Sequence, residues 1–183
     1  MAGKGIVTVV RPFPLIGLSC SVVAAILCVL SLSNSAWVTA ENFSLSLWEM
    51  CKMKSGKTGG QWDCWDCVDA RSSDWKVATI VLMFLGLILT LVAVALGLWS
   101  VCKSSHKFLK VIAGILCVAV LLQITALILY PVRFVEDSVL HSYHEFSWGY
   151  GVAWGSTIFL VGAAVFYFLK PHDYRYSQGP MQR

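Results

Sequence analysis

Residues 77–101 read VATIVLMFLGLILTLVAVALGLWSV and contain no Asp, Glu, Lys or Arg. A helix that rises about 1.5 Å per residue needs about 20 apolar residues to cross a hydrocarbon core about 30 Å thick. Three further charge-free runs occupy residues 12–40, 111–132 and 146–169. The sequence therefore predicts four membrane-spanning helices, at residues 14–34, 76–101, 110–131 and 149–169.

The composition agrees with lipid as the surroundings of this chain. Of its 183 residues, 57% are hydrophobic and only 13% are charged. The net charge of +4 is small and the basic residues form no continuous run, which argues against binding to nucleic acid. We expect one membrane domain, residues 1–183, with lipid as its main partner.

The basic residues favour cytoplasmic ends. Eight Lys or Arg residues and one acid lie on one side of the membrane, in residues 1–13, 102–109 and 170–183 together with Lys110. Six Lys or Arg residues and nine acids lie on the other side, in residues 35–75 and 132–148 together with Lys76. Short connections rich in Lys and Arg stay inside. We therefore expect both termini in the cytoplasm and residues 35–75 outside the cell.

The first outer segment carries two features of an extracellular loop. Asn42-Phe43-Ser44 is a sequon for N-glycosylation, which makes Asn42 a candidate site. Cys51, Cys64 and Cys67 lie in the same segment, where an oxidising exterior lets thiols pair. The chain has seven cysteines, an odd number, so spacing alone does not decide which of these pair.

The predicted spans lack the groups that transport or catalysis would use. None of the charge-free runs offers an ionisable side chain at mid-depth, where such groups mark ion and proton pathways. We expect Gln123 and Thr125 to bond a neighbouring helix. Aromatic residues at the span ends are typical of interfacial anchors; they are Trp37, Trp75, Trp99, Tyr130, Trp148, Tyr150 and Trp154. We predict no catalytic residue, no cofactor and no metal site.

The first outer segment also has the pattern of a small antiparallel sheet. Residues 43–48 alternate apolar and polar side chains, as a half-buried strand does, and residues 55–60 are rich in turn formers. A sheet this small has little core, so a disulfide between its strands would contribute about 2 to 4 kcal/mol.

Several residues of this segment resemble those of a known family. They match the outer-loop signature of the claudin superfamily, which includes the peripheral myelin and epithelial membrane proteins. The matching residues are Trp37, then Leu47-Trp48, then Cys51 and a second cysteine. Within it, the chain is most similar to the transmembrane protein 47 subgroup, a claudin-like branch associated with adherens junctions. The segments that carry this closer likeness are residues 46–49, 72–75, 129–136 and 143–151.

The resemblance implies a fold and a disulfide. The fold would be a left-handed four-helix transmembrane bundle with a small extracellular antiparallel β-sheet, to which the second outer loop adds an edge strand. Trp37 and Trp48 would hold this sheet at the bilayer surface. Counting back from residues 72–75, the second cysteine of the pair falls on Cys67, which leaves Cys64 as the alternative partner of Cys51.

The resemblance also implies a function. It points to a non-enzymatic protein of the lateral plasma membrane that organises cell-cell junctions, with the cadherin-catenin complex, other claudin-like chains or further copies of itself as partners. A paracellular barrier or channel is an alternative within the superfamily, although residues 41–76 hold six acids and five bases and so favour neither sign of ion. A remote alternative is a membrane thiol oxidoreductase that uses the C-x-x-C pair Cys64 and Cys67.

Two further expectations concern the cytoplasmic side. Cys102 lies beside Lys103 at the inner end of the second span, a setting that suits palmitoylation. The chain ends on Arg183, whereas PDZ domains take a hydrophobic C-terminal residue, so we expect no direct binding to a PDZ domain.

Overall fold

A computed structural model describes residues 12–34, 36–40, 43–54, 64–69, 74–103, 108–137 and 145–169. Asn42, the turn-rich residues 55–60 and the C-terminal tail lie outside the described residues, as do the side chains of Lys52, Cys64 and Trp65. The predictions of a glycan and of no PDZ contact therefore stay predictions.

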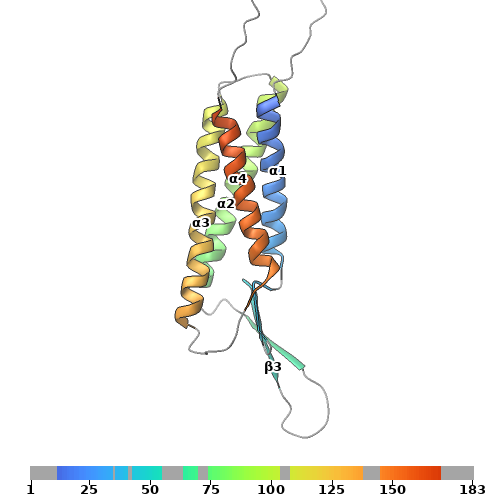
Figure 1. Ribbon diagram of the computed structural model, residues 1–183, viewed down its shortest axis with the longest axis vertical. Helices are drawn as coiled ribbons and strands as arrows, with labels where there is room; N and C mark the ends of the chain where they lie inside the picture. Colours follow the sequence, from blue (N-terminus) through green and yellow to red (C-terminus); the bar gives the residue numbers. More distant parts are fainter. Residues whose placement is uncertain are drawn as a thin grey trace, which may run out of the picture.

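Four long helices lie side by side and make up most of the molecule (Figure 1). They are α1 (Pro12–Leu32), α2 (Asp74–Lys103), α3 (Leu109–Asp137) and α4 (Trp148–Phe168). All four are long and apolar enough to cross a membrane. Helix α1 packs against α4 and α2, and α3 packs against the same two helices, which closes the bundle. The prediction of a four-span membrane fold is confirmed.

Helices α2 and α3 continue beyond both ends of their predicted spans, into segments where polar residues begin. Helix α3 runs to Asp137, past the span end expected at residue 131, and it contains Pro131. Helix α2 begins at Asp74 and ends at Lys103. A helix satisfies its backbone internally in water as well as in lipid, so its length need not equal the thickness of the hydrocarbon core.

Small side chains and one amide hold the centre of the bundle together. Gln123 on α3 is fully buried, accepts a hydrogen bond from Thr157 Oγ1 on α4 at 3.1 Å, and donates to Cys28 Sγ on α1 at 3.6 Å. A Cβ at Gly86 on α2 would lie 3.0 Å from the Gln123 side chain. Thr125 differs from its prediction, because it is exposed and donates to the carbonyl of Leu121 in its own helix.

A five-stranded antiparallel sheet lies beyond one end of the bundle (Figure 1). Its strand order is β4-β3-β2-β1-β5. The first four strands come from one connection, and β5 comes from the segment before α4, as the expected edge strand does. The strands are β1 (Val38–Ala40), β2 (Phe43–Leu45), β3 (Glu49–Lys54), β4 (Cys64–Asp69) and β5 (Glu145–Phe146).

The single strand predicted over residues 43–48 is wrong in its second half. Strand β2 ends at Leu45, and the Ser46 backbone N–H donates to the Glu49 carbonyl at 2.9 Å. The Ser46 hydroxyl oxygen also accepts from the backbone N–H groups of Trp48 and Glu49. A serine that satisfies nearby backbone groups favours a turn over continued strand pairing.

Candidate functional site

Two tryptophan indoles join the sheet to the end of α1. The last carbonyls of a helix have no partner within the helix. Here Trp37 Nε1 donates to the Ser31 carbonyl at 3.0 Å, and Trp48 Nε1 donates to the Leu32 carbonyl at 2.7 Å. Trp37 precedes β1 and Trp48 lies in the turn between β2 and β3, so the sheet is fixed to α1 at two places.

Trp37 lies inside the protein and therefore does not face lipid as an interfacial anchor would. It is 0% exposed, and its ring centroid lies 4.9 Å from that of Tyr130 on α3 and 5.9 Å from that of Tyr150 on α4. Tyr150 Oη donates to the Leu127 carbonyl at 2.9 Å, which ties α4 to α3. Trp37 therefore anchors the sheet to three helices of the bundle.

Trp48 and its neighbour Leu47 point towards the helices as well. Leu47 is fully buried, and the half-buried Trp48 ring packs edge-on against Phe84 of α2 at a centroid distance of 6.1 Å. The two central residues of the β2–β3 turn thus add α2 to the attachment. Every helix of the bundle contributes to the surface on which the sheet rests.

The start of α4 is fixed by a close approach of two backbones. The Ser31 hydroxyl donates to the Gly149 carbonyl at 2.9 Å, and the Ser147 backbone N–H donates to the Trp37 carbonyl at 2.9 Å. A Cβ at Gly149 would lie 2.6 Å from the Ala36 carbonyl oxygen. Only glycine fits this position without displacing the chain.

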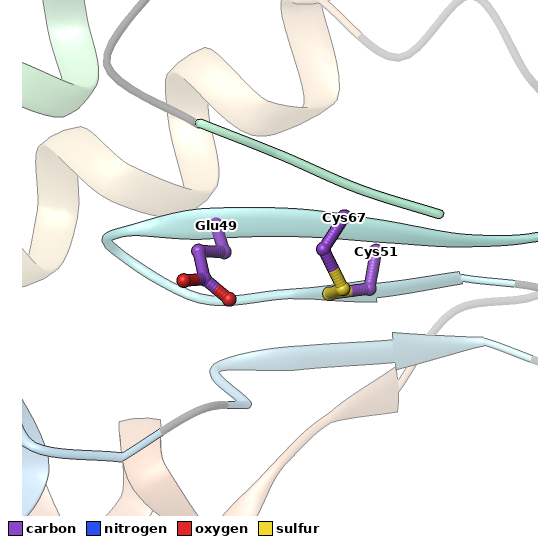
Figure 2. A group of neighbouring side chains, drawn as sticks. All are labelled: Glu49, Cys51 and Cys67. Carbon is purple, nitrogen blue, oxygen red and sulfur yellow. A yellow bond between two sulfur atoms is a disulfide. The ribbon is translucent and has the colours of Figure 1, made fainter. Parts of the chain in front are cut away.

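A disulfide joins the outer pair of strands. Cys51 in β3 and Cys67 in β4 are direct partners in the antiparallel register and form a disulfide (Figure 2). This is the pair that the resemblance implies. Cys51 is half-buried and Cys67 is exposed.

The Glu49 carboxylate lies within 4.8 Å of both sulfur atoms. Metal ions bind the thiolate form of cysteine. Because these two sulfurs are bonded to each other, this group offers a carboxylate and no thiolate.

The spacing along β4 bears on the C-x-x-C motif. Residues three apart in a strand have Cα atoms about 10 Å apart, whereas disulfides join Cα atoms less than about 7 Å apart. Cys64 and Cys67 both belong to β4. In this fold they cannot close the dithiol pair on which a thiol oxidoreductase depends.

The disulfide borders a shallow hollow on the sheet. The hollow has a volume of about 210 Å³ and is lined by Trp48, Glu49, Cys67, Val68 and Asp69. Glu49 and Asp69 are register partners at the end of the β3–β4 pair near the bundle. Val68 is 63% exposed, so the described surface of β4 is both acidic and apolar.

The sequence alone did not reveal all residues of this attachment. Their place at the span ends predicts that Tyr130 and Tyr150 are interfacial anchors, yet Tyr130 is 0% exposed and Tyr150 is half-buried. Ser31 and Gly149 carried no signal that separates them from other small residues in the spans. By contrast, Trp148 is 65% exposed, as an interfacial anchor is.

Four apolar helices topped by a small antiparallel sheet with a disulfide define a tetraspan membrane protein. The sequence model of the PMP-22/EMP/MP20/Claudin family matches residues 14–167, and the chain belongs to this family. It is 33% identical over 143 residues to a Danio rerio protein called p53 apoptosis effector related to PMP-22. The aligned region covers 76% of this chain and 73% of the relative.

Proposed function

We propose that this protein organises cell-cell contacts at the lateral plasma membrane without catalysing a reaction. The observation that carries this proposal is the attachment of the sheet through Trp37 and Trp48. A sheet held at two points on the bundle presents a surface of fixed orientation, which lowers the ordering cost of binding a partner.

The proposal places the sheet outside the cell. Disulfides persist in oxidising compartments, and Cys51–Cys67 belongs to the sheet. The excess of Lys and Arg in the connections at the opposite end supports cytoplasmic termini. Both arguments give the same orientation.

The contact surface we propose is the outer strand β4. It lies at one edge of the sheet order and exposes Asp66, Val68 and Asp69. An exposed apolar residue flanked by acids is suited to a protein partner with a complementary basic rim. By family resemblance, the partner is a junctional membrane protein, either of the cadherin-catenin complex or another claudin-like chain.

Imaging of the full-length chain, tagged at its C-terminus, tests this proposal in a polarised epithelial layer with cadherin and tight-junction markers. The wild type should concentrate at lateral contacts with the cadherin marker. Val68→Lys should reach the cell surface and spread evenly over it, because Val68 is exposed and the change leaves the core intact. Val77→Ala, at an exposed position on α2, serves as the control.

Other staining patterns would contradict it. Retention of the wild type in the endoplasmic reticulum, or even surface staining that Val68→Lys leaves unchanged, would refute a contact function of β4. Colocalisation with tight-junction markers and a changed electrical resistance of the layer would instead support the paracellular barrier.

The Danio rerio relative favours a second candidate. Its name describes a p53 apoptosis effector related to PMP-22, and the two chains share 33% identity over most of their lengths. A role in cell death would appear as increased caspase activity on expression of the wild type. If Val68→Lys abolishes enrichment at contacts but leaves caspase activation unchanged, the two roles use different surfaces.

A further inference from the structure

We propose that an anionic phospholipid binds at the end of the bundle opposite the sheet, with one acyl chain in an apolar groove and its phosphate at Lys103. The groove lies between the end of α2 and the start of α3. It has a volume of about 300 Å³ and is lined by Ala95, Leu96, Trp99 and Phe108. This inference assigns a ligand to a part of the molecule that the proposed contact function does not use.

The lining of the groove suits a hydrocarbon chain. Of the four described residues that line it, none carries a charge. The methyl group of Ala95 leaves space between the larger side chains of Leu96, Trp99 and Phe108. A chain seated there contacts protein atoms on several sides, and dispersion attraction summed over many such contacts is large. The groove therefore holds one acyl chain better than the smooth surface of a helix does.

Lys103 extends the stripe of α2 that lines the groove. Side chains at positions i, i+3 and i+7 of a helix lie on one face, and Leu96, Trp99 and Lys103 have this spacing. Side chains of a helix tilt towards its N-terminus, which here is the direction of the groove. Accordingly, Lys103 Nζ lies 4.7 Å from the centroid of the Trp99 ring. The ammonium group thus lies beside a residue that lines the groove.

The charge and the groove follow the order of the parts of a phospholipid. Lysine amines and tryptophan rings lie at the headgroup level of a bilayer, so Lys103 and Trp99 mark that level. Ala95 lies one turn of α2 further into the membrane, about 6 Å from Trp99 along the helix axis. A phosphate at Lys103 therefore has its acyl chain at the depth of the groove.

The charge at this end selects an anionic headgroup. Residues 102–110 contain three lysines and no acid. The Lys103 ammonium has three N–H donors and no acceptor, so it binds phosphate oxygens and repels the cation of a zwitterionic headgroup. In the orientation proposed above, this end faces the cytoplasmic leaflet, which holds the anionic lipids of the plasma membrane.

Native mass spectrometry of the full-length chain in detergent tests the headgroup. Dioleoyl phosphatidylserine and dioleoyl phosphatidylcholine are added in equal amounts, so that only the headgroups differ. We expect the wild type to retain phosphatidylserine in preference, and Lys103→Gln to lower this preference about fivefold, the effect of one surface lysine. Lys103→Arg should keep the preference. Lys4→Gln, which changes the net charge equally in another segment, should also keep it.

Photochemical cross-linking in nanodiscs tests the position of the chain. The probe is a phosphatidylserine with a diazirine in one acyl chain. After irradiation, peptide mapping should find cross-links to Leu96 or Phe108 in the wild type. Ala95→Phe fills the groove, so these cross-links should be lost. Ala78→Phe, the same change at an exposed position of α2 nearer the sheet, is the matched control and should retain them.

Three outcomes would overturn the proposal. The first is equal retention of the two lipids by the wild type, or an equal loss of preference in Lys103→Gln and Lys4→Gln. The second is cross-linking to Leu96 and Phe108 that persists in Ala95→Phe. The third is labelling of these residues by a photoreactive cholesterol that phosphatidylserine does not displace, which would assign the groove to a sterol. None of these measurements depends on cell contacts, so their failure would leave the proposed contact function standing.

Discussion

The indole N–H of Trp48 donates a hydrogen bond to the backbone carbonyl of Leu32 at 2.7 Å, which connects a turn of the sheet to the last residue of α1. The donor satisfies a carbonyl that the helix leaves without a partner. Trp37 makes the corresponding bond to Ser31, one residue earlier.

Replacing the Trp48 indole by another aromatic ring should weaken the attachment of the sheet to α1, because the N–H donor is lost while an aromatic side chain remains. In Trp48→Phe the aromatic contact with Phe84 is largely kept but the Leu32 carbonyl loses its partner, which should cost about 1 kcal/mol in free energy of unfolding. Hydrogen exchange of β2 and β3 in nanodiscs measures the effect. Trp99→Phe, at an exposed ring far from the sheet, should leave this exchange unchanged.

Gly149 should tolerate no side chain. A Cβ there would lie 2.6 Å from the Ala36 carbonyl oxygen, so Gly149→Ala should destabilise the protein by about 1 to 3 kcal/mol. Gly151 is the matched control, since among the described residues no atom lies within 4 Å of its Cβ position. Gly151→Ala should be neutral or stabilising by up to about 1 kcal/mol, because alanine favours the helix. Thermal unfolding in detergent compares the two; equal melting temperatures would contradict the close approach.

The Cys51–Cys67 bond should stabilise the outer hairpin. The two residues are 16 apart in sequence, and closing a loop of that size contributes about 3 kcal/mol. The double variant Cys51→Ser/Cys67→Ser should therefore be cleaved by protease between β3 and β4 much faster than the wild type. Cys64→Ser should be cleaved at the wild-type rate. Protection lost in Cys64→Ser instead would mean that Cys64 takes part in the bridge.

Glu49 should slow the reduction of this disulfide. Its carboxylate lies within 4.8 Å of both sulfurs, and the attacking species in thiol exchange is an anionic thiolate. Repulsion at this distance in water is worth about 1 kcal/mol, so Glu49→Gln should be reduced by glutathione about fivefold faster at low salt. The difference should shrink in concentrated salt, which screens exposed charges. A ratio independent of salt would exclude an electrostatic cause.

The amide of Gln123 should contribute a modest, measurable amount to the bundle. Its bonds to Thr157 and Cys28 join three helices, and buried bonds between membrane helices contribute about 0.6 to 1.7 kcal/mol. Gln123→Leu should lower the melting temperature accordingly. Thr125→Val is the control, since Thr125 is exposed and bonds its own helix. If both variants melt alike, the buried network contributes no stability.

The sequence predicted the parts of the fold that depend on local composition. Charge-free runs identify α2 and its three counterparts because lipid excludes charge along the whole of a span. The strand pattern located β2 but extended it beyond Leu45, since Ser46 and Leu47 continue the alternation of polar and apolar residues, while the burial of Leu47 arises from contacts with the bundle.

The attachment of the sheet could be predicted only in part. Trp37 and Trp48 were identified through resemblance, but their partners are backbone carbonyls, which no side-chain pattern reveals. Tyr130 shows the same limit. An aromatic ring at the end of a span suits both the membrane surface and a buried cluster, and only the packing of α3 against Trp37 decides between them.

The order of the strands also bears on how the protein is made. Strand β1 ends at Ala40, whereas its neighbour β5 begins at Glu145, about a hundred residues later. At roughly 5 to 20 residues per second, a ribosome takes roughly 5 to 20 seconds to reach β5. For that time one edge of β1 lacks its final partner, and the sheet is completed only after the third span has been synthesised.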